Sequence, residues 1–203
     1  MLFRSEFFLN FGLAGVKSVM LETDAKLFLD LKLHDIPNTV AGAATAIAAA
    51  KPDFLTVHAA GGTAMISAAV NALPSVNITA VTILTSLSNS DVSAIGFTSD
   101  ALTSAVGLAQ LATTAGARAI VCSPLEVSAI RSQLGQTPIV ITPGVRPLND
   151  QGSDDQQRTL TPKEAISSGA TYVVIGRPIT GSWPQGASAM RDKARSIADE
   201  ILN

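Results

Sequence analysis

The chain is built from short apolar runs that alternate with helical segments, and this alternation limits the folds it can adopt. The runs are continuously apolar, which is typical of parallel strands covered on both faces. They lie at 27–31, 54–57, 78–84, 119–122, 139–141 and 172–175. Alanine-rich amphipathic segments follow them, at about 38–50, 63–73, 100–115, 124–133, 162–168 and 187–202. The repeated order of strand and helix predicts βαβ units around a parallel sheet.

This pattern is compatible with an open doubly wound sheet or with a closed barrel. No G-x-G-x-x-G follows the first run, so the usual mark of a dinucleotide-binding open sheet is missing. Polar residues cluster just after the runs, as in barrels whose chemistry lies at the carboxyl ends of the strands. We therefore expect an α/β fold of the TIM (β/α)8 type in one domain, 1–203. About six βα units are recognisable after a leading helix at about 6–20, so the barrel is expected to be incomplete at its N-terminus.

Composition narrows the class of protein further. Hydrophobic residues make up 47% of the chain and charged residues 15%, which argues against a disordered or fibrous chain. The net charge of −2 gives no electrostatic reason to expect nucleic acid or an anionic membrane as a partner. Early charges do not suit a signal peptide, and the small-apolar stretch 40–50 is shorter than the ~20 residues of a membrane span. The lone Cys122 is interpreted as a small buried side chain in a reducing compartment, so we expect a cytoplasmic protein.

Two charges of opposite sign lie close together here, Asp30 inside the first apolar run and Lys32 directly after it. Asp30 and Lys32 alternate along the predicted strand, so both side chains should project from one side of it. Charges that face a low-dielectric interior are costly unless they are paired or used. Asp35 follows in the next loop, and Pro37 suits the first turn of the following helix. A structural ion-pair network is the alternative to a catalytic one.

Other candidate residues follow later strands. Gly176 lets the backbone approach a phosphate, and Arg177 presents a fork of donors to it, after the last run of a predicted barrel. A glycine turn with a solvated arginine is the alternative. His58 precedes a glycine-rich turn and is interpreted as structural rather than catalytic. Two histidines and one cysteine do not form a zinc-type cluster.

The segment Asp30-Leu-Lys32-x-x-Asp35-Ile36-Pro37-Asn38-Thr39 resembles the catalytic motif of bacterial orotidine 5'-phosphate decarboxylases. Similar segments follow in the family's order: 57–62, 84–86, 121–123, 142–147 and 174–180. The resemblance runs from about residue 6 to the C-terminus. It implies a carboxy-lyase that converts orotidine 5'-phosphate to uridine 5'-phosphate in pyrimidine synthesis, without a metal or other cofactor.

The resemblance also assigns roles to residues. It implies that Lys32 is the general acid that protonates C6 of the pyrimidine, and that Asp30 holds Lys32. Asp35 and its neighbours would reach across the interface of an obligate homodimer into the partner's active site. Thr85 would contact the pyrimidine, although a helix cap is nearly as good an interpretation of it. The substrate-binding residues implied in full are Ile36, Pro37, Asn38, Thr39, Thr85, Arg146, Gln156, Gly176 and Arg177, with Gln156 in a polar loop at 149–158.

The start of the chain departs from the family's pattern. Members begin with a strand ending in Ala-Leu-Asp and continue with a strand that bears a lysine in a Val-Lys-x-Gly context. Here Leu2 falls where that lysine is expected, and we expect Arg4 to be too far along to replace it without a change of register. We therefore expect the chain to be incomplete and weakly active or inactive alone.

Two other functions remain open on the sequence. One is a sugar-phosphate decarboxylase or aldolase of the same barrel superfamily, which also uses an Asp-x-Lys strand but with bound magnesium and a further acidic ligand. The other is an inactive nucleotide-binding fragment that keeps the phosphate grip. The His-Asp-Ile-Pro-Asn-Thr continuation disfavours the first function, and the three charges at 30, 32 and 35 disfavour the second.

Overall fold

The structure, a computed structural model, describes residues 1–147 and 159–202, which fall into two compact units. The first unit comprises Met1–Thr82 and Gly107–Ile120, and the second comprises Ile83–Val106 and Val121–Asn203. The expectation that 1–203 form a single domain stays a prediction.

The strands follow one another in the sheet in chain order, as repeated βα units require. The pairs β1–β2, β2–β3, β3–β4 and β6–β7 are parallel. The strands are β1 (Leu2–Arg4), β2 (Phe28–Leu33), β3 (Phe54–His58), β4 (Asn77–Val81), β5 (Ala119–Val121), β6 (Ile139–Thr142) and β7 (Tyr172–Val173).

Helices separate these strands along the chain. The α-helices are α1 (Ser5–Met20), α2 (Pro37–Ile47), α3 (Gly62–Ala72), α4 (Asn89–Ala94), α5 (Ala101–Thr114), α6 (Val127–Leu134), α7 (Pro162–Ser167), α8 (Arg177–Thr180) and α9 (Ala187–Leu202). Single 3-10 turns are η1 (Ala48–Ala50), η2 (Ala59–Gly61), η3 (Pro124–Glu126) and η5 (Trp183–Gln185).

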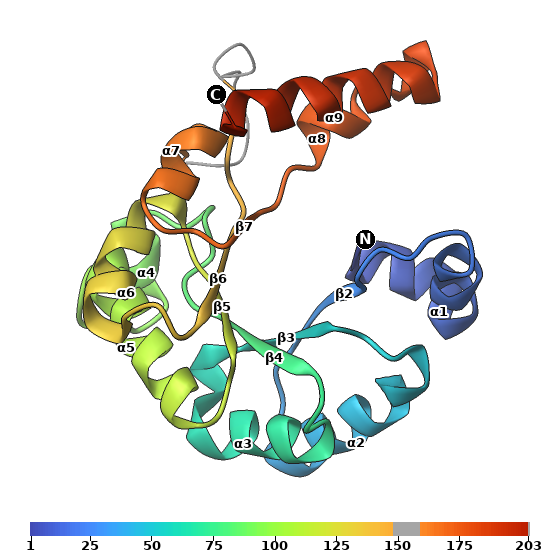
Figure 1. The fold of residues 1–203 in the computed structure, drawn as a ribbon. Coiled ribbons are helices and arrows are strands. Elements are labelled where there is room, and N and C mark those ends of the chain that lie inside the picture. Colours follow the sequence, from blue (N-terminus) through green and yellow to red (C-terminus); the bar gives the residue numbers. More distant parts are fainter. Residues whose placement is uncertain (148–158, 203) are drawn as a thin grey trace. The chain divides into compact units, whose positions relative to one another are not determined.

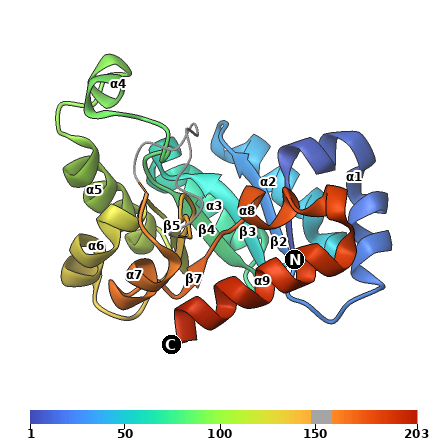
Figure 2. The ribbon, with the colours of Figure 1, turned by 90° about the horizontal axis from the view of Figure 1, so that it is seen from above.

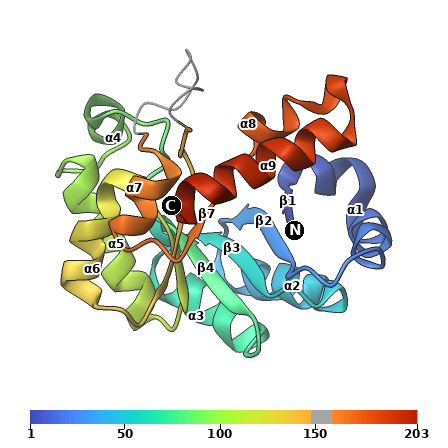
Figure 3. The same ribbon diagram turned by 45° about the horizontal axis from the view of Figure 1, so that its top comes forward.

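The core of the first unit lies between its strands and the helices that cover them. Figures 1 and 3 show β1 to β4 side by side, with α2 and α3 packed against each other on one face. Leu29, Leu55 and Ile78, from three neighbouring strands, are almost fully buried. Burial of such side chains is worth roughly 1.5–3 kcal/mol each relative to exposure, so this layer fixes the strand register.

The C-terminal helices of the second unit pack against one another. Helix α9 contacts both α7 and α8 (Figure 2). Val127, Ile130 and Val140 are fully buried here. Helix α7 begins with a capping box, in which the Thr161 hydroxyl and the Glu164 carboxylate satisfy each other's backbone N–H groups.

The six predicted strands and their predicted parallel arrangement are confirmed. The third and sixth of these strands are shorter than the apolar runs that predicted them. The run 78–84 is a strand only over Asn77–Val81, and the run 172–175 only over Tyr172–Val173. The leading helix is also confirmed, and Cys122 is buried as expected.

Strand β1 was not predicted from the sequence, because it has three residues and only Phe3 among them is buried. The strand is defined by its pairing with β2. A single buried residue shows no hydrophobic periodicity from which a strand could be predicted.

Arg131 of α6 connects the segments that precede β6 and β7 through side-chain hydrogen bonds. Its Nε donates to the Gly169 carbonyl at 2.8 Å, one terminal nitrogen donates to the Pro138 carbonyl at 2.8 Å, and the other donates to the Thr171 hydroxyl at 3.0 Å. A guanidinium presents these donors in a fixed plane, which an ammonium cannot reproduce.

We therefore expect Arg131→Lys to lower the free energy of unfolding by about 1–3 kcal/mol, because carbonyls would lose their donors. Urea titration followed by circular dichroism measures this change. The control is Arg191→Lys on the exposed face of α9, which should stay within about 0.5 kcal/mol of the parent chain. Equal stabilities for the two variants would contradict the role given to Arg131.

Candidate active site

An ion pair at the carboxyl end of β2 forms the centre of the site. The Lys32 Nζ lies 2.7 Å from each carboxylate oxygen of Asp30. The Asp30 side chain is 10% exposed and the Lys32 side chain 34% exposed. The prediction that these charges lie on one side of the strand is therefore confirmed, and the carboxylate is the more deeply buried partner.

The backbone at Lys32 departs from an ordinary strand. Its φ is +52°, in the left-handed region that non-glycine residues rarely adopt. The register between β2 and β3 also shifts here, from Leu29 opposite Leu55 to Leu33 opposite Val57. A bulge of this kind re-aims side chains and is common beside active sites.

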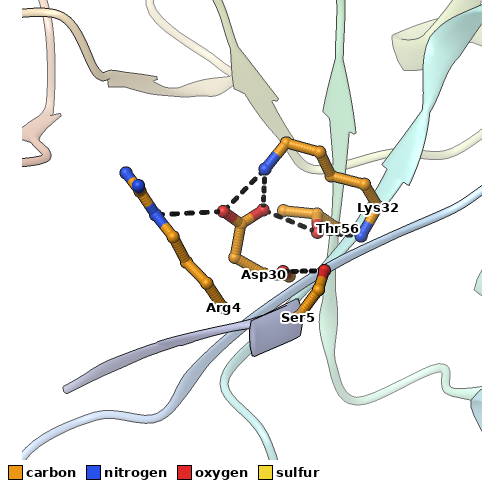
Figure 4. A network of polar contacts seen from close by, with 5 residues as sticks. All are labelled: Arg4, Ser5, Asp30, Lys32 and Thr56. Carbon is orange, nitrogen blue, oxygen red and sulfur yellow. Dashed lines mark hydrogen bonds and ion pairs between the residues drawn. The ribbon is translucent and has the colours of Figure 1, made fainter. Parts of the chain in front are cut away.

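Thr56 of β3 bridges the two parts of this bulge (Figure 4). The Lys32 backbone N–H donates to the Thr56 hydroxyl at 2.8 Å, and that hydroxyl lies 3.0 Å from the Asp30 Oδ1 and donates to it. Thr56 is fully buried. One side chain therefore contacts both the backbone of the lysine and the carboxylate that holds its ammonium.

Strand β1 adds a second cation to the same carboxylate. Arg4 lies opposite Asp30 in the parallel register, and its Nε is 3.8 Å from the Asp30 Oδ2 (Figure 4). The Ser5 hydroxyl lies 3.5 Å from the Asp30 carbonyl. The expectation that Arg4 is too far along the chain to replace the lysine expected at position 2 stays a prediction, since this contact with Asp30 does not test it. Leu2 and Arg4 share a face of β1, and the long arginine side chain reaches Asp30 without a change of register.

The segment after β2 is exposed. All six residues from His34 to Thr39 are exposed, with Ile36 at 66%. The prediction that Pro37 begins a helix is confirmed. Within the described chain the Lys32 side chain pairs with Asp30, whereas the Asp35 carboxylate accepts the Ile36 N–H at 2.6 Å. The N-cap of α2 is Ile36, and no side chain caps this helix.

Two histidines lie beside the ion pair. The rings of His34 and His58 are 5.3 Å apart between centroids. Burial lowers the pKa of His58 below its ordinary value, and the nearby charges of His34 and Lys32 lower this pKa further, while Asp30 acts in the opposite direction. The neutral imidazole is therefore favoured at His58. Its interpretation as a structural histidine stays a prediction.

The remaining predicted residues belong to the second unit. Thr85 and Arg146 are buried. Thr85 is not a helix cap, because Ser88 caps α4 with a capping box. Gly176 precedes α8, and Arg177 is the first residue of that helix. Gln156 and the polar loop around it lie outside the described residues.

Sequence reasoning missed Thr56 and Arg4. Thr56 lies within a run that was interpreted only as an apolar strand, and a polar residue at a buried strand position was the available signal. Arg4 could be placed only once β1 was known, because nothing in the sequence fixes its register against β2.

Two features are absent from the described residues, a metal-binding cluster and a membrane-spanning helix. No group of three or more His, Cys, Asp or Glu side chains in residues 1–147 and 159–202 converges as a metal site would need. None of the helices in this part of the chain has both the length and the apolar character to cross a membrane.

The chain is similar to proteins of known sequence and structure. The model of the "Orotidine 5'-phosphate decarboxylase / HUMPS family" matches residues 4–191. An orotidine 5'-phosphate decarboxylase of Thermobifida fusca is 50% identical over 184 residues, which cover 91% of this chain and 78% of that protein. One from Frankia casuarinae is 52% identical over 164 residues, which cover 81% of this chain and 60% of that protein.

A solved structure shares the fold. The crystal structure of orotidine 5'-phosphate decarboxylase from Lactobacillus acidophilus matches with a TM-score of 0.83 and 34% identity, and the match covers 100% of this chain and 86% of that chain. The predicted fold class, an α/β chain of the TIM-barrel type, is confirmed by this match.

The lowered pKa of His58 predicts a dependence of stability on pH. Below about pH 6.5 the unfolded chain binds a proton that the folded chain resists, so the free energy of unfolding should fall as the pH drops from ~7 to ~5. His58→Gln should make this fall shallower, as measured by urea titration across the range. His34→Gln should keep most of the slope, because the largest cause is the burial of His58 itself. A slope unchanged in His58→Gln would contradict this assignment.

Proposed function

We propose, because the chain belongs to the orotidine 5'-phosphate decarboxylase / HUMPS family, that it is a carboxy-lyase converting orotidine 5'-phosphate to uridine 5'-phosphate. The observation that carries this proposal is the ion pair at the end of β2, where the Lys32 ammonium is held at 2.7 Å from both Asp30 oxygens. An ammonium on a parallel strand's carboxyl end is placed where such folds carry out chemistry.

Lys32 acts in this proposal as the general acid. The bond between C6 and the carboxylate carbon breaks, carbon dioxide leaves, and the electron pair stays on C6. The Lys32 Nζ delivers a proton to C6, giving uridine 5'-phosphate, and the lysine then regains a proton from solvent. Its positive charge also stabilises the negative charge that develops on C6 before the proton arrives.

Asp30 serves to hold the acid in place. Both of its carboxylate oxygens accept hydrogen bonds from the Lys32 ammonium, and Oδ1 also accepts one from the Thr56 hydroxyl. The Arg4 guanidinium forms an ion pair with Oδ2. Arg4 is 61% exposed, so solvent weakens its contact, and the dominant partner of Asp30 is Lys32. With its carboxylate occupied in this way, Asp30 limits the positions that the ammonium can take, which is what proton transfer to a ring carbon requires.

The nucleotide is bound by residues of the second unit in this proposal. Arg146, Gly176 and Arg177 take the phosphate, because arginine offers paired donors and glycine gives close access to the backbone. A Cβ added at Gly176 would meet nothing within 4 Å, so the space beside its backbone is open. Thr85 contacts the pyrimidine, and Gln156 contacts the phosphate or base.

The proposal includes a homodimer with shared active sites. Asp35 and the residues Ile36 to Thr39 are exposed in the single chain, which suits a segment that enters the partner's site. The Asp35 carboxylate would complete the surroundings of the partner's Lys32 ammonium. The cytoplasmic location also stays a prediction.

Turnover of orotidine 5'-phosphate, followed by absorbance, tests the reaction. Lys32→Ala should lower kcat by at least ~10³, since the general acid and the charge that stabilises C6 are lost together. Lys163→Ala on the exposed start of α7 is the control and should keep the parent rate. A chelator should have no effect, whereas the magnesium-dependent sugar-phosphate reaction would be lost. Binding of uridine 5'-phosphate without turnover, both by this chain and after addition of the two N-terminal strands that the resemblance leads us to expect, would overturn the proposal in favour of a binding protein.

Mixing two inactive variants tests the shared site. In a dimer of Lys32→Ala and Asp35→Asn chains, one site has lost both groups and the other has kept both. Equal mixing after reversible dissociation should therefore restore about a quarter of the parent activity, since about half of the dimers are mixed. Sedimentation measures the oligomeric state in parallel. A mixture as inactive as its components would show that Asp35 does not act across an interface.

A further inference from the structure

We infer that Thr56 is a positioning residue for the proposed reaction, because its hydroxyl fixes the Lys32 backbone and the Asp30 carboxylate relative to each other. This inference rests on the proposed function and assigns a role to a side chain that does not itself reach the reacting atoms.

The first step concerns the backbone of Lys32. Its left-handed φ of +52° is sterically unfavourable for a residue with a side chain, and such conformations persist only where the surroundings hold them. The shift of register between β2 and β3 interrupts the regular pairing of backbone groups at this point. The Lys32 N–H instead donates to the Thr56 hydroxyl at 2.8 Å.

The second step concerns the direction of that hydroxyl. A threonine hydroxyl has one proton to donate and two lone pairs to accept. Here a lone pair is taken by the Lys32 N–H, and the single proton points to the Asp30 Oδ1 at 3.0 Å. The backbone donor at Lys32 therefore excludes the opposite orientation, and the hydroxyl can serve Asp30 only as a donor.

The third step links these contacts to the ammonium. Lys32 Nζ is held by the carboxylate of Asp30, and the Lys32 backbone is held by the hydroxyl that also holds this carboxylate. The bonds form a closed loop of three residues on two strands. The Thr56 hydroxyl therefore holds the lysine backbone directly and the lysine ammonium through the Asp30 carboxylate. A well-placed proton donor needs such an arrangement.

Thr79 provides a matched control on the neighbouring strand. It lies opposite Thr56 in the register of β3 and β4 and is likewise fully buried. Its hydroxyl donates to the Asn77 carbonyl at 2.9 Å and contacts neither member of the ion pair. Substitution of either threonine by valine keeps the volume and removes a buried hydroxyl, so the two variants should lose similar stability.

The test compares kcat, KM and thermal stability in Thr56→Val, Thr56→Ser and Thr79→Val. Thr56→Val should lower kcat about a hundredfold through a misplaced ammonium, with a smaller change in KM. Thr56→Ser keeps the hydroxyl and should restore most of the rate, and Thr79→Val should leave kcat near the parent value. Equal losses of kcat in Thr56→Val and Thr79→Val, or no rescue by serine, would overturn the inference. If Thr56→Val does not fold, Thr56→Cys takes its place, because a thiol is a weaker donor of similar size.

Hydrogen exchange at the Lys32 amide gives a readout that needs no turnover. The amide should exchange at least about tenfold faster in Thr56→Val than in the parent chain, and Thr79→Val should not change it. Unchanged exchange in Thr56→Val would overturn the inference even if the chain is active. An intact chain without turnover, but with faster exchange in Thr56→Val, would instead overturn the proposed function and leave the geometry of Thr56 standing.

Discussion

The pairing of the Lys32 ammonium with the Asp30 carboxylate is the interaction on which the rest of the site depends. Two charges on one strand end would be costly to bury singly, because neither desolvated charge would have a counterion. Their mutual contact at 2.7 Å offsets that cost, and it occurs where the backbone of Lys32 adopts a left-handed φ of +52°. The ion pair and the irregularity of β2 therefore lie at the same position of the sheet.

Parallel strands explain why residues far apart in the chain meet at this pair. The carboxyl ends of β1, β2 and β3 lie at one edge of the sheet, so Arg4, Asp30 and Thr56 become neighbours although about 25 residues separate each from the next. Each strand contributes a different chemical group to the same carboxylate: a guanidinium, the carboxylate itself and a hydroxyl. A substitution on any one strand would change the surroundings of the lysine.

The predicted functional residues divide between the two compact units. The ion pair, its threonine and the exposed segment at 34–39 belong to the first unit, while Thr85, Arg146 and Arg177 belong to the second. The first unit contains the lysine proposed as the proton donor, and the second contains the residues proposed to bind the nucleotide. This division follows the order of the βα units along the chain.

The repeating βα pattern, the parallel strands and the pair Asp30 and Lys32 could all be predicted from the amino-acid sequence. These features depend on local patterns: apolar runs alternate with helical segments, and residues two apart on a strand share a face. Tertiary structure alone decided which other groups join that pair. Strand β1 exists because three residues pair with β2, and Thr56 reaches Lys32 because a register shift between β2 and β3 frees the lysine's amide. Register and backbone conformation arise from contacts between distant segments, so no local pattern could have revealed them.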